Sequence, residues 1–305
     1  MKFHISYPVH SDVDGGAWIT PANMVRFAQT LEKAGLHGLG FTDHPAPSRK
    51  WLEGGGHESF DPYAALCFCA AATSKLRLMT RLAVVPYRNP LLQARSMMTL
   101  DVLSGGRATF VLGVGYLRSE FAALGVDFEE RNALFDEAVE VIQGVWRDEA
   151  FVYEGRHFKA LGQSMAPTVV QRPHPPLWLG GNSRLVLERV ARWGQGWAVL
   201  FGAAQVAQTS RTPAITNEAD LAVALTDLEG RLARYGRKLS DIDIDVGPEA
   251  SNLTASLSAQ ERIDRLSALK PLGVTWAGLR VPEASFEGAC EAVQRFGEEV
   301  IAKLD

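Results

Sequence analysis

The sequence predicts a (β/α)8 barrel, in which eight parallel strands alternate with eight helices. Short apolar runs alternate with longer segments of helical periodicity along the chain. The length of 305 residues suits one such barrel, so we expect a single domain over residues 1–305. Hydrophobic residues make up 47% of the chain, which is enough for a large core without a disulfide or a metal.

Eight apolar runs have the length and composition of strands. They lie at residues 2–7, 38–42, 77–85, 108–114, 176–180, 196–200, 242–246 and 274–280. Eight segments with helical periodicity lie at residues 21–34, 62–73, 90–103, 131–147, 183–193, 218–235, 259–269 and 286–303. Eight strand–helix pairs favour a closed barrel over an open sheet.

Two segments interrupt this alternation. Residues 149–175 hold two short extended pieces and end in a proline-rich run that excludes a helix. Residues 202–217 are rich in Ala, Gln, Thr and Ser and predict a mobile loop. Because the first segment leads into strand five and the second leaves strand six, we expect both to reach the active face of the barrel.

Charge and motifs narrow the class of protein. The formal net charge of -4 gives no global attraction to nucleic acid or anionic lipid, and no apolar run reaches the ~20 residues of a membrane span. The chain enters a strand at its start, which leaves no room for a signal peptide. The odd set of Cys67, Cys69 and Cys290 indicates reduced thiols, and the histidines lack metal-binding spacing. We therefore expect a cytoplasmic protein without a metal site.

The most informative segment is Leu100–Arg107 with the strand that follows it. It predicts a helix end, a Ser-Gly-Gly turn and a buried strand that ends at Gly113 and Gly115. Glycines at the C-terminal end of a barrel strand let a ligand approach the backbone closely. We expect a binding site there, although the complete GxGxxG fingerprint is absent.

Asp43 and His44 follow the second strand, where catalytic side chains lie in barrels of this type. Histidine is the side chain best suited to proton transfer near neutral pH. The alternative is that Asp43 caps a turn and His44 only lines a loop.

Two further loops carry polar groups. After strand three, Asn89 and Pro90 predict a helix start, and Arg88 is able to clamp a cofactor or a carboxylate. After strand five, Gly180–Asn182 precede a helix whose first N–H groups either face an anion or belong to an ordinary turn capped by Ser183.

Weaker candidates for a substrate pocket are two tryptophans and the residues after strand four. Trp18 and Trp51 lie in loops after strands one and two, where they either wall a pocket or pack in the core. Tyr116, Arg118 and Glu120 follow strand four and either reach the substrate or, for Arg118 and Glu120, form a solvated ion pair.

Five motifs in order resemble those of the bacterial luciferase-like flavin and deazaflavin oxidoreductases. They are Phe41–His44, Pro86–Pro90, Leu100–Arg107, Leu112–Gly115 and Trp178–Asn182. The resemblance covers residues 1 to about 200. Within the family, the chain is most similar to the actinobacterial group that uses coenzyme F420, an 8-hydroxy-5-deazaflavin.

The resemblance implies hydride transfer between F420 and a small organic substrate, with Asp43 and His44 as catalytic residues at the ring. It also implies a non-prolyl cis peptide bond in strand three, within the stretch Arg81–Ala83, although Arg81 stands where many relatives have a small residue. The expected cofactor-binding residues are Asp43, His44, Arg81, Leu82, Ala83, Gly113, Gly115, Gly180, Gly181 and Asn182. Of these, Gly180, Gly181 and Asn182 are expected to hold the cofactor's phosphate.

The same resemblance predicts the oligomeric state and leaves alternative functions open. Relatives are commonly homodimers, and the helix expected at 62–73 is apolar on every side, so we expect a homodimer. One alternative is an FMN-dependent monooxygenase, which needs oxygen and a flavin reductase partner. Another is a flavin-binding protein without turnover. Ser48 stands where sugar-phosphate-oxidising relatives tend to have Trp, which argues against that substrate.

Overall fold

The structure is a computed structural model that describes residues 1–202, 204–210, 212–247 and 252–304. It confirms the predicted fold class, because eight parallel strands form a closed barrel in the order β1-β10-β9-β8-β7-β4-β3-β2. The strands are β1 (Lys2–Ser6), β2 (Gly38–Phe41), β3 (Arg77–Val84), β4 (Ala108–Gly113), β7 (Leu177–Gly180), β8 (Gly196–Val199), β9 (Asp243–Val246) and β10 (Trp276–Leu279). The pair β5 (Val152–Glu154) and β6 (Lys159–Leu161) forms a separate antiparallel hairpin.

Helices form in all eight of the predicted periodic segments, and the described residues add three short helices, α2, α5 and α8, where none is predicted. They are α1 (Pro21–Lys33), α2 (Arg49–Glu53), α3 (Pro62–Ala72), α4 (Pro90–Leu103), α5 (Arg118–Ala123), α6 (Arg131–Arg147), α7 (Arg184–Trp193), α8 (Ala204–Thr209), α9 (Glu218–Arg234), α10 (Ala259–Leu269) and α11 (Phe286–Glu299). Short 3-10 helices are η1 (Val13–Ile19), η2 (Val85–Tyr87), η3 (Leu239–Asp241), η5 (Lys270–Leu272) and η6 (Ile301–Lys303). As predicted, Asn89 caps α4 with Pro90 at its first position, and Ser183 caps α7.

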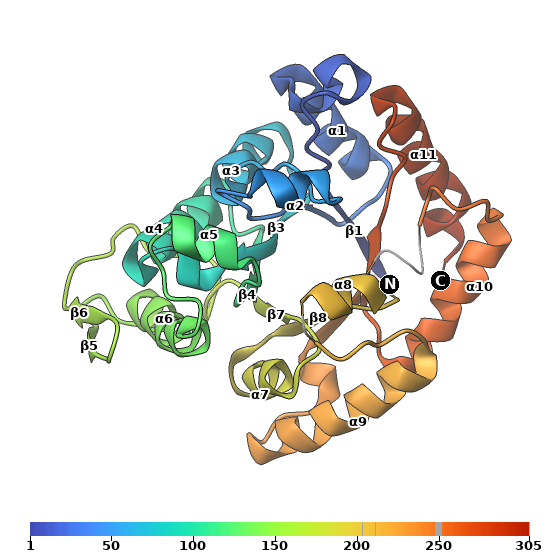
Figure 1. The fold of residues 1–305 in the computed structure, drawn as a ribbon. Coiled ribbons are helices and arrows are strands. Elements are labelled where there is room, and N and C mark those ends of the chain that lie inside the picture. Colours follow the sequence, from blue (N-terminus) through green and yellow to red (C-terminus); the bar gives the residue numbers. More distant parts are fainter. Residues whose placement is uncertain (203, 211, 248–251, 305) are drawn as a thin grey trace. The chain divides into compact units, whose positions relative to one another are not determined.

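The chain divides into two compact units. The first comprises Met1–Gly40, Lys75–Arg77 and the described part of Leu177–Asp305, and the second comprises Phe41–Ser74 and Leu78–Pro176. The prediction of a single domain therefore stays a prediction. In the first unit, α1 lies beside α11, and α7 lies beside α9 (Figure 1).

Trp18 lies in the aromatic core of the first unit. It is fully buried, and its ring meets those of Tyr7, Phe27 and Phe286 at centroid distances of 5.6, 5.4 and 5.1 Å. Its Nε1–H donates to the carbonyl oxygen of Glu283 at 2.8 Å. The interpretation of Trp18 as a wall of the substrate pocket is therefore wrong, because an indole buried on all sides has no face for a substrate.

In the second unit, one end of the segment 149–175 lies away from the active face that the sequence predicts for it. Asp101, buried in α4, accepts the backbone N–H groups of Val170 and Gln171 at 2.7 and 3.1 Å. The amide of Gln171 also donates to Asp101 Oδ1 and to the carbonyl oxygen of Ala108, the first residue of β4. This end of the segment therefore lies at the N-terminal end of a barrel strand, opposite to the strand ends that form the active face.

The segment 202–217 contains a helix where the sequence predicts only a loop. α8 forms from Ala, Gln and Val residues, several of which favour helices. The side-chain amide of Asn182 donates to the carbonyl oxygens of Leu200 and Pro213, which fixes both sides of this segment. Two positions of this prediction, 203 and 211, lie outside the described residues.

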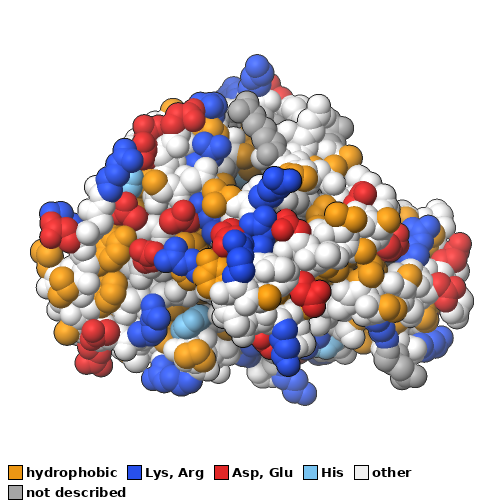
Figure 2. All heavy atoms as spheres, turned by 90° about the horizontal axis from the view of Figure 1, so that it is seen from below, with side chains coloured by type: hydrophobic (Ala, Val, Ile, Leu, Met, Phe, Trp, Pro, Cys, Tyr) orange, Lys and Arg blue, Asp and Glu red, His pale blue; other side chains and the backbone are white. Residues whose placement is uncertain are grey.

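The surface carries both signs of charge. On the face drawn in Figure 2, basic and acidic side chains are interspersed with apolar ones, in keeping with the formal net charge of -4. One face of α3 is uncovered in the single chain, because Phe68 is 43% exposed and Ala64 and Ala71 are exposed. Over the described ranges, no helix has the length and apolarity of a membrane span, and no group of three or more metal-ligating side chains forms.

Candidate functional site

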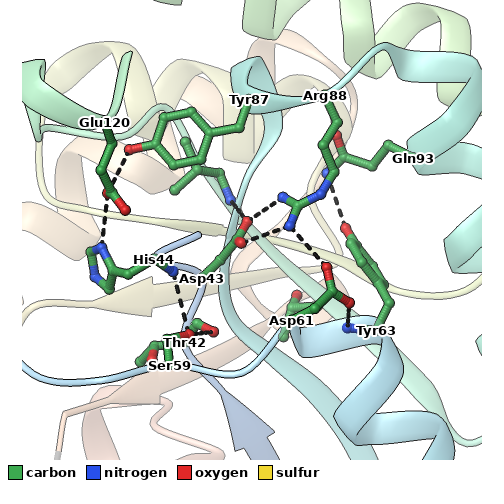
Figure 3. A network of polar contacts seen from close by, with 12 residues as sticks. Thr42, Asp43, His44, Ser59, Asp61, Tyr63, Tyr87, Arg88, Gln93 and Glu120 are labelled. Atoms are coloured by element: carbon green, nitrogen blue, oxygen red, sulfur yellow. Dashed lines mark hydrogen bonds and ion pairs between the residues drawn. The ribbon is translucent and has the colours of Figure 1, made fainter. Parts of the chain in front are cut away.

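The residues that follow β2 lie in a polar network within the second unit (Figure 3). The strand ends at Phe41, and Asp43 and His44 come directly after Thr42. The backbone N–H of His44 donates to Ser59 Oγ at 3.3 Å, and Ser59 Oγ donates to the carbonyl oxygen of Thr42 at 2.7 Å. These bonds fix the backbone from which the side chains of Asp43 and His44 project.

Asp43 is buried and bonded within the chain. Its Oδ2 accepts a hydrogen bond from Arg88 at 2.6 Å and from the backbone N–H of Val84 at 2.9 Å, and its Oδ1 accepts from Arg88 at 2.8 Å. A carboxylate with three such donors holds the end of β3 and the loop after it in place. The predicted role of Asp43 in contacting the cofactor stays a prediction, and the turn-capping alternative does not describe these contacts.

Arg88 binds carboxylates of its own chain. Besides Asp43, it donates to Asp61 Oδ2 at 3.1 Å, while Asp61 Oδ1 caps α3 through the N–H groups of Tyr63 and Ala64. Burial alone would lower the pKa of Arg88, but its hydrogen bonds with Asp43 and the carboxylate charge raise it above the ordinary value. Of the two roles predicted for Arg88, the structure shows the carboxylate clamp.

His44 forms a pair with a buried glutamate. Its Nδ1 lies 3.0 Å from Glu120 Oε2, which also accepts the hydroxyl of Tyr87 at 3.0 Å. Glu120 Oε1 accepts the backbone N–H of Ala46 at 3.1 Å. Glu120 is fully buried, while 10% of the His44 side chain is exposed. The alternative of a solvated pair between Arg118 and Glu120 is therefore wrong.

The ionisation of this pair follows from its contacts. Burial alone would raise the pKa of Glu120, but the hydrogen bond and charge of His44, with the bonds from Ala46 and Tyr87, hold it below the ordinary value. Burial and the charge of Glu120 raise the pKa of Tyr87. Glu120 is thus a carboxylate at neutral pH, and Tyr87 is a hydroxyl.

Aromatic rings surround His44. Its ring centroid lies 4.5 Å from that of Trp51, 5.0 Å from that of His57 and 6.1 Å from that of Tyr116. Burial and the charge of Glu120 raise the pKa of Tyr116 to about 12. The structure therefore brings two of the predicted pocket residues, Trp51 and Tyr116, to His44.

The glycines at and just after the end of β4 make room for side chains of the same chain. A Cβ at Gly113 would lie 2.4 Å from Leu82 Cδ1, and one at Gly115 would lie 2.7 Å from a methyl of Val84 and 2.8 Å from the Phe121 ring. Leu82 follows a cis peptide bond between Arg81 and Leu82, within the expected stretch that ends at Ala83. The space beside Gly113 is filled by Leu82, so close ligand approach does not account for this glycine.

The loop after β7 uses its own hydrogen-bonding groups. The N–H of Gly181 donates to the carbonyl oxygen of Ala198 at 3.1 Å, and the N–H of Asn182 donates to Thr212 Oγ1 at 3.0 Å. Asn182 is buried, and Gly181 has φ +115°. The two N–H groups expected to hold a phosphate therefore already have acceptors, and for Gly180, Gly181 and Asn182 that role stays a prediction without support from this geometry.

Arg118 does not join the group around His44. It pairs with Glu129 at 2.8 Å, its guanidinium lies 4.1 Å from the Phe128 ring centroid, and 56% of its side chain is exposed. Sequence reasoning left Glu120 ambiguous and missed Tyr87 and His57. The available signal was their place in the connections that follow β2, β3 and β4, because polar residues there lie at the active face of a barrel.

A comparison with known protein families shows to which family the chain belongs. The model of the family described as luciferase-like monooxygenase matches residues 1–269. The chain belongs to this family. The predicted resemblance is confirmed at the level of the luciferase-like family, whose similar proteins include both F420-dependent enzymes and FMN-dependent monooxygenases.

Individual luciferase-like relatives are similar at low identity. An FMNH(2)-dependent dimethylsulfone monooxygenase from Pseudomonas putida is 30% identical over 45% of this chain and 37% of its own length. An F420-dependent glucose-6-phosphate dehydrogenase from Nocardia farcinica is 26% identical over 78% of this chain and 70% of its own length. The monooxygenase RslO1 from Streptomyces bottropensis superposes with a TM-score of 0.84 at 22% identity, covering 100% of both chains.

These matches cover only part of some relatives, so the activities of the relatives are not assigned to this luciferase-like chain. The chain spans 47% and 37% of the length of two of the curated relatives that it matches. The structural likeness at 22% identity shows the fold. Cofactor and substrate are therefore argued from the site.

Proposed function

We propose that this luciferase-like protein is an F420-dependent oxidoreductase that transfers a hydride to or from a small organic substrate. The observation that carries the proposal is His44, which lies after β2 with its Nδ1 on a buried carboxylate and its ring among Trp51 and Tyr116. Within the described part of the chain, His44 Nε2 has no hydrogen-bond partner. It is therefore the atom that holds or moves a proton for the substrate.

The residues around His44 fit a planar ring cofactor. Indole and phenol faces stack on flat ring systems, and Trp51 and Tyr116 both lie by the His44 imidazole. A bound F420 would supply the ring carbon that gives or takes the hydride. Trp51 and Tyr116 would orient the ring and exclude water, and Asp43 with Arg88 holds the backbone at Val84, the last residue of β3.

Two relatives support F420 over FMN. The F420-dependent glucose-6-phosphate dehydrogenases from Nocardia farcinica and Kribbella flavida match 78% and 73% of this chain, whereas the FMNH(2)-dependent relative matches 45%. Ser48, the N-cap of α2, departs from the Trp expected for sugar-phosphate oxidation. We therefore expect a small alcohol or carbonyl compound as substrate, and not a sugar phosphate.

An FMN-dependent monooxygenase is the second candidate. It is favoured by the 30% identity to the FMNH(2)-dependent dimethylsulfone monooxygenase. In that case the protein would need a separate flavin reductase to supply reduced FMN, together with oxygen as co-substrate.

Parallel titration tests the proposal. Purified protein is titrated with oxidised and reduced F420 and FMN, and hydride transfer is followed by F420 absorbance with a panel of alcohols and carbonyl compounds that includes glucose 6-phosphate. We expect saturable F420 binding and turnover of one compound class. Tighter binding of reduced FMN with oxygen consumption would favour the second candidate, and F420 binding without any turnover would contradict an enzymatic role.

Variants at two histidines locate the reaction. His44→Ala should lower single-turnover hydride transfer by about 10²–10⁴-fold while F420 affinity changes little, because proton transfer and positioning act on the barrier. His157→Ala is the matched control, since this histidine also pairs with a glutamate, Glu130, at 3.3 Å but lies in the turn between β5 and β6. Equal rates for the two variants would show that His44 is not at the reacting centre.

A further inference from the structure

Glu120 accepts hydrogen bonds from three different residues. It lies on the short helix α5, it is fully buried, and it carries a negative charge. Burying a carboxylate costs free energy unless hydrogen bonds satisfy it. Here three donors do so, from His44, Ala46 and Tyr87, and they come from the two segments that follow β2 and β3.

The three bonds determine which nitrogen of His44 carries a proton. An ionised carboxylate only accepts hydrogen bonds. Because Glu120 Oε2 lies 3.0 Å from His44 Nδ1, that nitrogen is the donor and bears the hydrogen. In a neutral imidazole the other nitrogen is then unprotonated and basic.

Resting on the function proposed above, we propose that Glu120 is a positioning residue that holds His44 as the tautomer protonated on Nδ1, so that Nε2 is the nitrogen that exchanges a proton with the substrate. Tyr87 completes the arrangement by donating its hydroxyl to the same oxygen, at 3.0 Å. A buried carboxylate that orients a histidine in this way also fixes the direction of its ring.

Among the residues that the structure describes, only Glu120 bonds to His44 Nδ1. The titratable side chains that face it are Glu120 from α5, Tyr116 from the loop after β4 and His57 from the segment after α2. The Nδ1 of His57 bonds to the carbonyl oxygen of Glu58 at 3.0 Å, and Tyr116 meets His44 edge-on with ring centroids 6.1 Å apart. Asp43, the neighbour in sequence, is bonded to Arg88.

The substitution Glu120→Gln changes the donor pattern with almost no change in shape. If the amide oxygen takes the place of Oε2, the NH2 group faces the N–H of Ala46, so two donors oppose each other. If the amide is turned, its NH2 group faces His44 Nδ1, which must then accept, and the imidazole proton moves to Nε2. Only the turned orientation leaves no two donors opposed, because its amide oxygen accepts the N–H of Ala46, so we expect this orientation and with it the loss of the tautomer protonated on Nδ1.

Nitrogen NMR of the histidine side chains tests the tautomer without any cofactor. Protein labelled with ¹⁵N-histidine is measured at pH 8. The His44 signals are those that disappear in His44→Ala. We expect a protonated Nδ1 and an unprotonated Nε2 in the wild-type protein. A proton on Nε2, whether in the other tautomer, in a mixture or in the charged ring, would overturn the proposal.

Variants then separate positioning from simple structural support. In Glu120→Gln we expect the wild-type tautomer pattern to be lost and kcat to fall about 10²–10⁴-fold, with the Kd for F420 unchanged. Glu129→Gln is the control, because Glu129 is exposed and pairs with Arg118. An unchanged His44 spectrum in folded Glu120→Gln would contradict the proposal. If Glu120→Gln does not fold, as judged by circular dichroism, the wild-type tautomer decides the question.

This design keeps the two proposals apart. If the protein turns over neither cofactor, the function proposed above fails, while the NMR result still reports whether Glu120 fixes the His44 tautomer. If turnover is found but His44 carries its proton on Nε2, the function stands and the role of Glu120 is refuted.

Discussion

Replacing Arg88 with Met should destabilise the protein far more than the loss of a surface ion pair. Arg88 binds both oxygens of Asp43, whose side chain is 1% exposed. Met keeps much of the length of the arginine side chain but leaves the Asp43 carboxylate with only the Val84 N–H among the bonds described above. A buried charge that has lost its partner is the costly outcome, more than the loss of the pair itself.

The size of the effect follows from this burial. Breaking a buried ion pair by removing one partner costs about 3–5 kcal/mol, and we expect the lower end because 21% of the Arg88 side chain is exposed. With an unfolding entropy of about 2.1 cal/mol/K per residue, a chain of 305 residues should lose about 5 °C in Tm for about 3 kcal/mol.

Calorimetry of three variants tests this reasoning. Arg26→Met is the matched control, because Arg26 also binds both oxygens of a carboxylate, Glu287, but the two side chains are 51% and 60% exposed. Its Tm should fall much less. Adding Asp43→Asn to Arg88→Met should recover part of the loss, since a neutral amide needs no counter-ion. Equal losses for Arg88→Met and Arg26→Met, or full additivity in the double variant, would refute the argument.

Three further outcomes are expected. Gly113→Ala should lower the free energy of unfolding by about 1–3 kcal/mol, because its Cβ would lie 2.4 Å from Leu82 Cδ1. Gly230→Ala should stabilise α9, because no atom lies within 4 Å of the added Cβ. Urea unfolding measures both effects. The pKa of Glu120 is lowered in the folded chain, so the ionised carboxylate stabilises the fold fully above the ordinary glutamate pKa. This stabilisation is lost as the pH falls through the lowered pKa of the folded state. Between about pH 7 and about pH 3, the Tm of Glu120→Gln should therefore drop less than that of the wild type. Light scattering at micromolar concentration should give twice the monomer mass, and Phe68→Glu on the uncovered face of α3 should reduce it; a monomer in the wild type would contradict the dimer.

The positions of the elements could be predicted from the sequence because local signals coincide with the packing. The cap and proline of Asn89 and Pro90 set the start of α4 as predicted. The prediction at 286–303 ran past the end of α11 at Glu299, because residues 301–303 continue as a short 3-10 helix with similar spacing. α8 was missed because its six residues are too few for a periodic pattern to stand out.

The candidate site was predictable only in part. His44 was identified from its place after β2, but the sequence could not show whether Glu120, three positions into a six-residue helix, faces solvent or the core. Nor could it show that Leu82 fills the space beside Gly113, since that contact joins two strands across the sheet. Burial and pairing between distant segments decide such questions, and neither has a signature in local composition.

The contacts of Asp101 have a consequence for how the chain folds. They join Asp101 in α4 to Val170 and Gln171, which lie 69 and 70 positions further along the chain. These bonds therefore form only after a long loop has closed. The entropy cost of closing a loop increases only slowly with its length. Bonds of this kind that are absent from the folding transition state retard unfolding without speeding folding. The contacts of Asp101, in the segment Leu100–Arg107, would then govern how long the native fold persists, while the proposed chemistry depends on residues after the opposite ends of the strands.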